Sequence, residues 1–282
     1  MVIERAHLKA LCDYEAEAAN VRAAFNAAST DPVRLVRFLS YYTSWNSLFG
    51  SGVSSLAGKI GRSRALFREP GLPHAVADRS VLVASYFFDA ARDEFDDRDT
   101  EHRDTHRCLA QATLIGALGW ARTQSKAKEL DDASLDAFLA EPMWLAALRH
   151  RVTVGYGGGT PDEASTVFRS IGYHLGSELL ADQEFSQLDL CLRERCPGLV
   201  EHLEGNQVTI AGQAHDAYQW IGIHSGHGGG AEADHFDWAL QGALRAFEFV
   251  DPADHTELRH QIEDGYVDFA RDHREFFERS AG

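Results

Sequence analysis

The chain of 282 residues lacks long apolar runs and basic segments. Its longest apolar stretches, 81–88 and 113–120, are far shorter than the ~20 residues that cross a bilayer as a helix. With 27 Lys and Arg against 43 Asp and Glu, the formal net charge is −16, which repels nucleic-acid phosphates and anionic membrane surfaces. The N-terminus also lacks the cationic flank and apolar core of a secretory signal. We therefore expect a cytoplasmic protein that binds neither nucleic acid nor membrane.

Cysteine and strand-forming patterns are scarce as well. Four cysteines are too few for a disulfide framework, and the spacing of Cys191 and Cys196 does not match a zinc knuckle. No segment alternates apolar and polar residues over the length of a strand, and 151–154 is the one short β-branched run. Hydrophobic residues still make up 44%, close to the roughly 45–50% of globular proteins, so the chain can build a core.

Helical patterns recur along the whole chain. The segment 160–185 opens with a capping-box sequence at 160–163 that has proline in the first helical position. The last helix begins in the same way, with Asp251 as cap and Pro252 after it. Further helices are predicted over 5–28, 31–48, 52–67, 74–96, 100–122, 132–150, 182–195, 198–224 and 231–249. With no repeat and no linker, the pattern predicts a single all-α domain over 1–282, a helical bundle.

Carboxylates and histidines that fall on apolar helix stripes must be paired or metal-bound, and three segments carry them. In the first, the stripe of Phe168, Ile171 and Leu175 continues to Glu178, with His174 four residues earlier on nearly the same face. A carboxylate that is hydrogen-bonded within a core is the alternative interpretation. The stripe therefore predicts a buried Glu178 without fixing its role.

The second segment spans two neighbouring helices. Glu94 ends a helix whose body, 81–88, is apolar almost all round, and His106 heads the stripe of the next helix. The charged connector between them is expected to be a solvated loop. Glu101 within it is kept as an alternative ligand to Glu94.

The third segment follows a glycine run. Glu232 and His235 are three residues apart, so they share one face of a helix, which continues with the small residues Ala239, Gly242 and Ala243. Small residues there would let a neighbouring helix approach closely. Inward carboxylates and histidines from several bundle helices build dinuclear iron or manganese sites. Carboxylates outnumber thiols here, which favours these metals over structural zinc.

These motifs resemble those of the heme-oxygenase-like diiron oxidases and oxygenases. The likeness rests on Glu94-Phe95, His106 with Leu109, the stretch 172–178, and Glu232-x-x-His235. It implies a heme-oxygenase-like bundle of about seven core helices that holds two Fe(II) ions and activates O2. The metal ligands implied are Glu94, His106, Glu178, His227, Glu232 and His235, with Glu101 and His224 in reserve.

The chain departs from the family pattern in two places. The gap between Glu94 and His106 is longer than usual. Gly228 stands four residues before Glu232, where the family has histidine. His227 would then serve through a local bulge, and His224 is the alternative.

The resemblance implies an enzyme, a non-heme iron-dependent oxidoreductase acting on a small molecule. The expected substrate is an amino acid or amine of natural-product biosynthesis, and the outcome desaturation, cyclisation, N-oxygenation or C–C cleavage. An external electron donor is a further partner that this chemistry allows. Arg103 or Arg169 would hold a substrate carboxylate. Phe269, Phe276 and Phe277 on the last helix exceed what one stripe needs, which favours a homodimer.

Two other functions remain open from the sequence. A metal-free enzyme of the same fold, thiaminase-like or a cofactor-independent oxidase, would use Glu178 or Glu184 as its acid or base. A non-enzymatic helical binding module would keep its histidines as satisfied core groups. That module predicts that His106, Glu178 and His235 lie more than ~10 Å apart, since the ligands of one dinuclear centre must converge.

Overall fold

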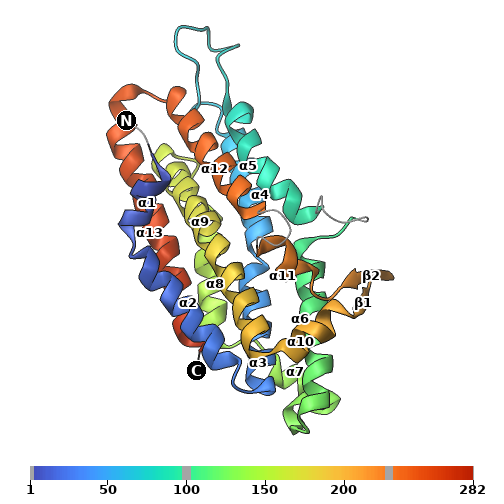
Figure 1. The fold of residues 1–282 in the computed structure, drawn as a ribbon. Helices are drawn as coiled ribbons and strands as arrows, with labels where there is room; N and C mark the ends of the chain where they lie inside the picture. Colours follow the sequence, from blue (N-terminus) through green and yellow to red (C-terminus); the bar gives the residue numbers. More distant parts are fainter. Residues whose placement is uncertain (1–2, 97–102, 226–230, 282) are drawn as a thin grey trace.

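The computed structural model describes residues 3–96, 103–225 and 231–281, except the side chains of 182 and 231–234, and these residues are mostly helical (Figure 1). The all-α prediction is confirmed. The first helices are α1 (Arg5–Leu11), α2 (Tyr14–Ala28), α3 (Pro32–Asn46), α4 (Phe49–Arg62), α5 (Ser80–Phe95), α6 (His106–Gln124), α7 (Asp132–Phe138) and α8 (Met143–Gly155). The later ones are α9 (Ala164–Arg195), α10 (Pro197–Glu204), α11 (Gln219–His224), α12 (Ala231–Glu248) and α13 (His255–Ser280). Two 3-10 turns, η1 (Lys128–Leu130) and η2 (Pro252–Asp254), and a small hairpin complete these elements.

The longest helix, α9, runs through the middle of the bundle beside α13 (Figure 1). Two glycines let these helices touch backbone to backbone. A Cβ on Gly172 would lie 2.0 Å from the Ile262 carbonyl oxygen, and one on Gly265 would lie 1.9 Å from the Arg169 carbonyl oxygen. Any side chain at either position would push the helices apart, so this pair of glycines fixes the spacing at the centre of the fold.

On the other side of α9, small residues bring α12 close to α5. A Cβ on Gly242 would lie 2.7 Å from the Phe87 ring. The predicted close approach of a neighbouring helix to this face is therefore confirmed. Gly50 on α4 does the same for the end of α5, since its Cβ would lie 2.8 Å from that of Glu94. These approaches pack α5 against α12 and its C-terminal turn against α4.

The prediction of one helix over 198–224 is wrong. This region contains α10, then β1 (Gln207–Ile210) and β2 (Gln213–Asp216) in an antiparallel pair, then α11. Ala211 and Gly212 both have positive φ, 52° and 85°, as a two-residue hairpin turn with matching twist requires. Glycine in second position permits this turn, and the run Val208-Thr209-Ile210 favours a strand over a helix.

Helix beginnings were predicted with mixed success. The capping box at 160–163 is wrong, because α9 begins at Ala164 and Glu163 makes no side-chain cap. Thr160 instead accepts a hydrogen bond from the buried Lys59 Nζ at 2.8 Å. The Asp251 cap is confirmed, as its carboxylate accepts from the Ala253 amide at 2.9 Å, although the first turn is 3-10 in form.

The main core is a large cluster of buried apolar side chains that draws on helices from both ends of the chain, and a small second cluster joins Val36, Ala121, Leu130 and Phe138. The main core includes Phe269, Phe276 and Phe277, so the aromatic excess of the last helix is used within the chain. The argument for a homodimer from these residues is therefore wrong. All four cysteines are free. Across the described residues, no helix combines the length and apolarity needed to cross a bilayer.

Candidate metal centre and pocket

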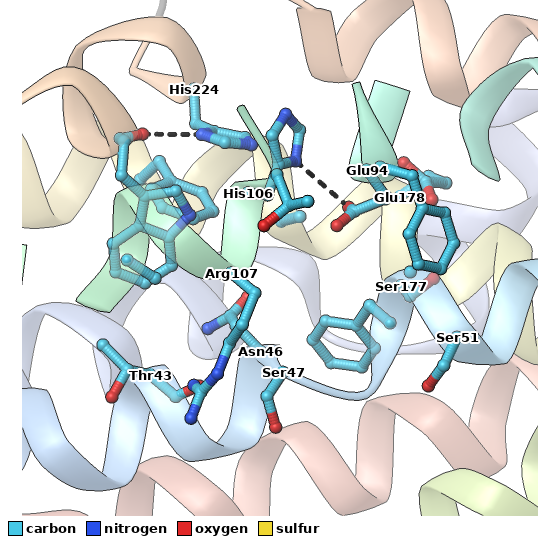
Figure 2. A pocket seen from close by; sticks show the side chains of 18 residues that line it. Thr43, Asn46, Ser47, Ser51, Glu94, His106, Arg107, Ser177, Glu178 and His224 are labelled. Carbon is cyan, nitrogen blue, oxygen red and sulfur yellow. Dashed lines mark hydrogen bonds and ion pairs between the residues drawn. The ribbon is translucent and has the colours of Figure 1, made fainter. Parts of the chain in front are cut away.

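Carboxylates and imidazoles from five helices gather beside one pocket, and Figure 2 shows those that line it, Glu94, His106, Glu178 and His224. The helices are α5, α6, α9, α11 and α12. The side chains, in the same order, are Glu94, His106, His174 with Glu178, His224 and His235. We call this set the Glu/His cluster. Four of the residues singled out as ligands from the sequence, Glu94, His106, Glu178 and His235, belong to it, and so does the reserve ligand His224.

The α5 and α6 side of the cluster pairs Glu94 with His106. The Glu94 Oε1 atom lies 3.4 Å from His106 Nδ1, and the His106 ring meets the His224 ring at a centroid distance of 4.6 Å. His224 Nδ1 is 2.6 Å from the carbonyl oxygen of Trp220 and therefore donates its proton there. That bond leaves Nε2 of His224 as the ring nitrogen with a lone pair, which is the form that binds metals.

The α9 and α12 side is built around the Glu178 carboxylate. Its Oε1 atom lies 3.3 Å from His174 Nδ1, and its Oε2 atom lies 3.6 Å from His235 Nδ1. His235 Nε2 lies 3.0 Å from Asp93 Oδ2 and donates to that carboxylate. The other ring nitrogen of His235 then faces Glu178. A proton on that nitrogen, through which His235 lowers the pKa of Glu178, or a cation between the two groups makes the arrangement favourable.

Burial and neighbouring charge set the protonation states in the cluster. Burial works to raise the pKa of Glu94, but His106, His224 and His235 bring that pKa below its usual value. The pKa of Glu178 is lowered in the same way, with burial opposed by His174 and His235. Burial, reinforced by His106, lowers the pKa of His224 to about 3. The carboxylates are thus anionic and His224 neutral at pH 7, which are the forms that ligate metals.

Hydrogen bonds from outside the cluster orient His174. The Tyr156 hydroxyl lies 2.7 Å from Ser177 Oγ, and both hydroxyl groups lie about 3.5 Å or less from His174 Nδ1. Burial lowers the pKa of His174, with Glu178 opposing. The Nε2 atom of this ring is buried and has no hydrogen-bond partner. A buried imidazole nitrogen left without a partner is costly, so this position needs an explanation beyond packing.

The donor set fits a metal ion, although its arrangement here is that of ion pairs. Two donor atoms bound to one metal at about 2.1 Å lie roughly 3.0–3.5 Å apart, close to the separations between Glu94 and His106 and between Glu178 and His174. Within the described residues, however, no three His, Cys, Asp or Glu side chains form a group arranged to hold a metal. The side chains pair with one another instead.

Three of the predicted ligands cannot be placed. Glu101 and His227 lie outside the described residues, as does the side chain of Glu232. The backbone of Glu232 lies in the first turn of α12, three residues before His235, so the two positions share a helix face as expected.

The pocket next to the cluster has a volume of about 250 Å³. Glu94, His106, Glu178 and His224 form part of its wall, and Glu94 keeps 25% of its side-chain surface exposed. The apolar part of the wall consists of Phe49, Phe95, Ala110, Ala181, Phe185 and Trp220. The remaining wall is polar and comes mainly from the end of α3 and the start of α6. Its labelled members in Figure 2 are Thr43, Asn46, Ser47, Ser51, Arg107 and Ser177.

The two arginines expected to hold a substrate carboxylate pair with acidic residues of the chain instead. Arg169 binds Asp264 and Asp268 on α13, and Arg103 lies 3.3 Å from Asp96. Neither arginine lines the pocket. Arg107 does line it, although no sequence pattern indicated this.

Asp93, next to Glu94 in the sequence, was not predicted either. The signal for Asp93 was its place three residues after Ala90, on the buried side of α5.

A second buried cluster lies away from the pocket. His273 on α13 stands between Glu184, with Oε1 at 3.0 Å from Nε2, and Glu17, with Oε2 at 3.5 Å from Nδ1. Arg274 also binds Glu17. Glu184, a candidate acid or base for a metal-free enzyme, is thus paired with His273 and does not line the pocket.

Comparisons of the chain with protein-family models, with curated proteins and with solved structures give no match. The resemblance to heme-oxygenase-like diiron enzymes therefore remains a prediction, and the argument for function rests on the Glu/His cluster and its pocket.

Proposed function

We propose that the protein is a non-heme iron enzyme that uses O2 to oxidise a small molecule bound in the pocket, with the Glu/His cluster as its metal centre. The observation that carries the proposal is the contact between Glu178 Oε2 and His235 Nδ1 at 3.6 Å. Because His235 Nε2 donates a hydrogen bond to Asp93, Nδ1 faces Glu178, and a cation between these two groups would stabilise the arrangement. The same pattern of an imidazole facing a carboxylate recurs at Glu94 and His106.

The convergence of the cluster also argues against a plain binding module. That alternative expected His106, Glu178 and His235 to lie far apart. Instead Glu178 contacts His235 directly, and Glu94 interacts electrostatically with both His106 and His235. Five helices contribute to the cluster, and assembling that many buried ionisable groups is costly unless they serve a purpose.

The choice of metal follows from the donors. Carboxylate oxygens and imidazole nitrogens without thiolates suit Fe(II) and Mn(II), whereas thiolates would favour zinc or copper. The sequence resemblance to heme-oxygenase-like diiron enzymes supports iron, and two ions, among these. Bound Fe(II) would supply the reduction of O2, which no side chain in the pocket can perform.

The residues of the chain would then do three things. Glu94, His106, Glu178, His224 and His235 would hold the metal in the wall of the pocket, where a substrate can reach it. Asp93 and the Trp220 carbonyl, through the second nitrogens of His235 and His224, fix the ring orientations. The aromatic wall would limit the access of water to the reacting atoms and so would reduce side reactions with water.

The test is anaerobic titration of the purified chain with Fe(II), followed by metal analysis after desalting. We expect stoichiometric iron uptake in the wild type and loss of uptake in Glu178→Gln and His235→Gln. His260→Gln, an exposed histidine on α13, is the matched control and should bind iron normally. Melting curves of all variants separate lost metal binding from lost folding.

A second measurement addresses the oxidation itself. On exposure to O2, the iron-loaded wild type should consume O2 and the two cluster variants should not, as recorded with an oxygen electrode. If the wild type takes up no iron, or if the cluster variants bind it as the wild type does, the proposal is wrong. The metal-free alternative would then be favoured.

A further inference from the structure

Arg107 lies in the first turn of α6 and forms the polar end of the pocket. Its Nη1 atom donates to the Thr43 carbonyl oxygen at 2.7 Å, which ties the side chain to the end of α3. Figure 2 shows it extending toward Asn46 and Ser47, away from Glu94 and His106. The pocket therefore has a guanidinium group at one end and the Glu/His cluster at the other.

Arg107 has no acidic partner in the part of the chain that the structure describes. Other arginines nearby are paired, such as Arg149 with Glu141 and Arg103 with Asp96. Burial lowers the pKa of Arg107, the Arg149 guanidinium adds to this effect, and no described carboxylate opposes it. In an acidic protein with 43 carboxylates, it is unusual for an arginine that lines a pocket to have no carboxylate partner among the described residues. It marks a position where a ligand can supply the negative charge.

We infer that Arg107 binds the carboxylate of the substrate and so makes the enzyme specific for small carboxylic acids. This inference rests on the proposed function, since it names the substrate class of the same pocket. With Nη1 held by the Thr43 carbonyl, the Nε and Nη2 edge of the guanidinium remains, a planar pair of donors that matches the two oxygens of a carboxylate. A phosphate dianion would call for further cations, and Arg107 is the single basic side chain, histidines aside, that lines this pocket within the described residues.

The rest of the pocket defines the body of the substrate. Phe49, Phe185, Trp220, Ala110 and Ala181 make its wall mainly apolar between the two ends. Its volume of about 250 Å³ is below the roughly 300–1,000 Å³ of pockets for drug-sized ligands. The substrate is therefore a small acid with an apolar body, bound by its carboxylate at Arg107 and oxidised at a carbon or nitrogen that reaches the cluster.

The experiment compares acids with their neutral amides. The probes are L-leucine, L-phenylalanine, hexanoate and octanoate, each paired with the primary amide of the same skeleton. Dissociation constants are measured by calorimetry with the full chain under nitrogen, with and without Fe(II). We expect at least one acid to bind the wild type at least tenfold more tightly than its amide, because a charge-assisted bidentate contact is lost in the amide.

Arg107→Gln should remove this preference, so that acid and amide bind alike, while its Fe(II) uptake stays at the wild-type level. Arg34→Gln, an exposed arginine on α3 outside the pocket, makes the same change in net charge and should keep the preference. A wild type that binds no acid more tightly than its amide overturns the inference. So does an Arg107→Gln variant that still prefers acids, since the metal or another group would then hold the carboxylate.

Iron uptake distinguishes a wrong substrate class from a wrong proposed function. If iron binds at the cluster but Arg107 has no role in acid binding, the substrate class is wrong and the proposed function stands. If iron does not bind, the proposed function fails whatever the calorimetry gives.

Discussion

Replacing Asp93 with asparagine tests how the Glu/His cluster holds His235. The Asp93 carboxylate accepts a hydrogen bond from His235 Nε2 at 3.0 Å, and both side chains are buried, with 6% and 2% of their surface exposed. The bond fixes a proton on Nε2, and Nδ1 then faces Glu178, whose Oε2 atom lies 3.6 Å away. The variant keeps the shape of the side chain and removes its charge.

The magnitude follows from the kind of bond that is lost. A hydrogen bond to a charged group contributes about 1.5–3 kcal/mol and a neutral one about 0.5–1.5 kcal/mol, so the change costs about 1–1.5 kcal/mol. That energy corresponds to roughly a tenfold weaker affinity for Fe(II). In addition, the asparagine NH2 group can donate to Nε2, which would move the ring proton to Nδ1 and point it at Glu178. Both effects act in the same direction.

The assay is anaerobic Fe(II) titration of wild type and Asp93→Asn, with Asp89→Asn as control. Asp89 lies on the exposed side of α5 and makes the same chemical change without touching the cluster. We expect Asp93→Asn to bind Fe(II) about tenfold more weakly than the wild type, and Asp89→Asn to bind it with unchanged affinity. Equal iron affinity in a folded Asp93→Asn variant would refute the assignment of His235 as a ligand oriented by Asp93.

Three further predictions concern the fold. Gly265→Ala should destabilise the protein by about 1–3 kcal/mol, because its Cβ would overlap the backbone of α9, whereas Gly58→Ala, in open space on α4, should stabilise it by about 0.5–1 kcal/mol; urea unfolding measures both. Burial alone would lower the pKa of His273, but hydrogen bonds to the carboxylates of α2 and α9 raise it above its unfolded value. Its stabilising contribution is therefore complete below about pH 6.5 and lost as pH rises through the folded pKa, so the fall in unfolding free energy above neutral pH should be smaller in His273→Phe. Lys59→Met should lower the melting temperature markedly, since it leaves carbonyl oxygens of the loop before α9 without their buried donor, and an unchanged melting curve would contradict this.

The helices and their buried faces could be predicted from the sequence because the evidence for them is local. The stripe that leads from Phe168 to Glu178 repeats at helical spacing, and the structure buries its apolar residues along α9, with 12% of the Glu178 side chain exposed. The small residues after His235 likewise predicted a close helix approach, which Gly242 makes against Phe87. Such features need only the periodicity of one helix.

What the sequence did not reveal depends on contacts between distant segments. The hairpin after α10 was missed because its strands are four residues each, too short to show alternation against the helical background. Arg107 was missed because its exposure to the pocket is set by the end of α3, some sixty positions away, whose Thr43 carbonyl holds it. Arg169 was expected to hold a substrate carboxylate because the sequence does not show its partners, Asp264 and Asp268, which come from the last helix.

Within the candidate site, the sequence predicted several of the residues that lie together, and not how they pair. Glu178 and His235 were chosen separately, one from a stripe and the other from a spacing motif, and their contact arises from the packing of α12 against α9. Asp93 completes the arrangement through the close approach of α12 to α5. Such contacts across three helices have no signature in any single segment.

The central claim is that a metal ion lies between Glu178 and His235, and anomalous X-ray diffraction at the iron edge tests it most directly. Crystals of the full chain loaded anaerobically with Fe(II) should show an anomalous peak about 2.0–2.3 Å from a Glu178 oxygen and from His235 Nδ1. A peak elsewhere, or none at full iron loading, would contradict the account.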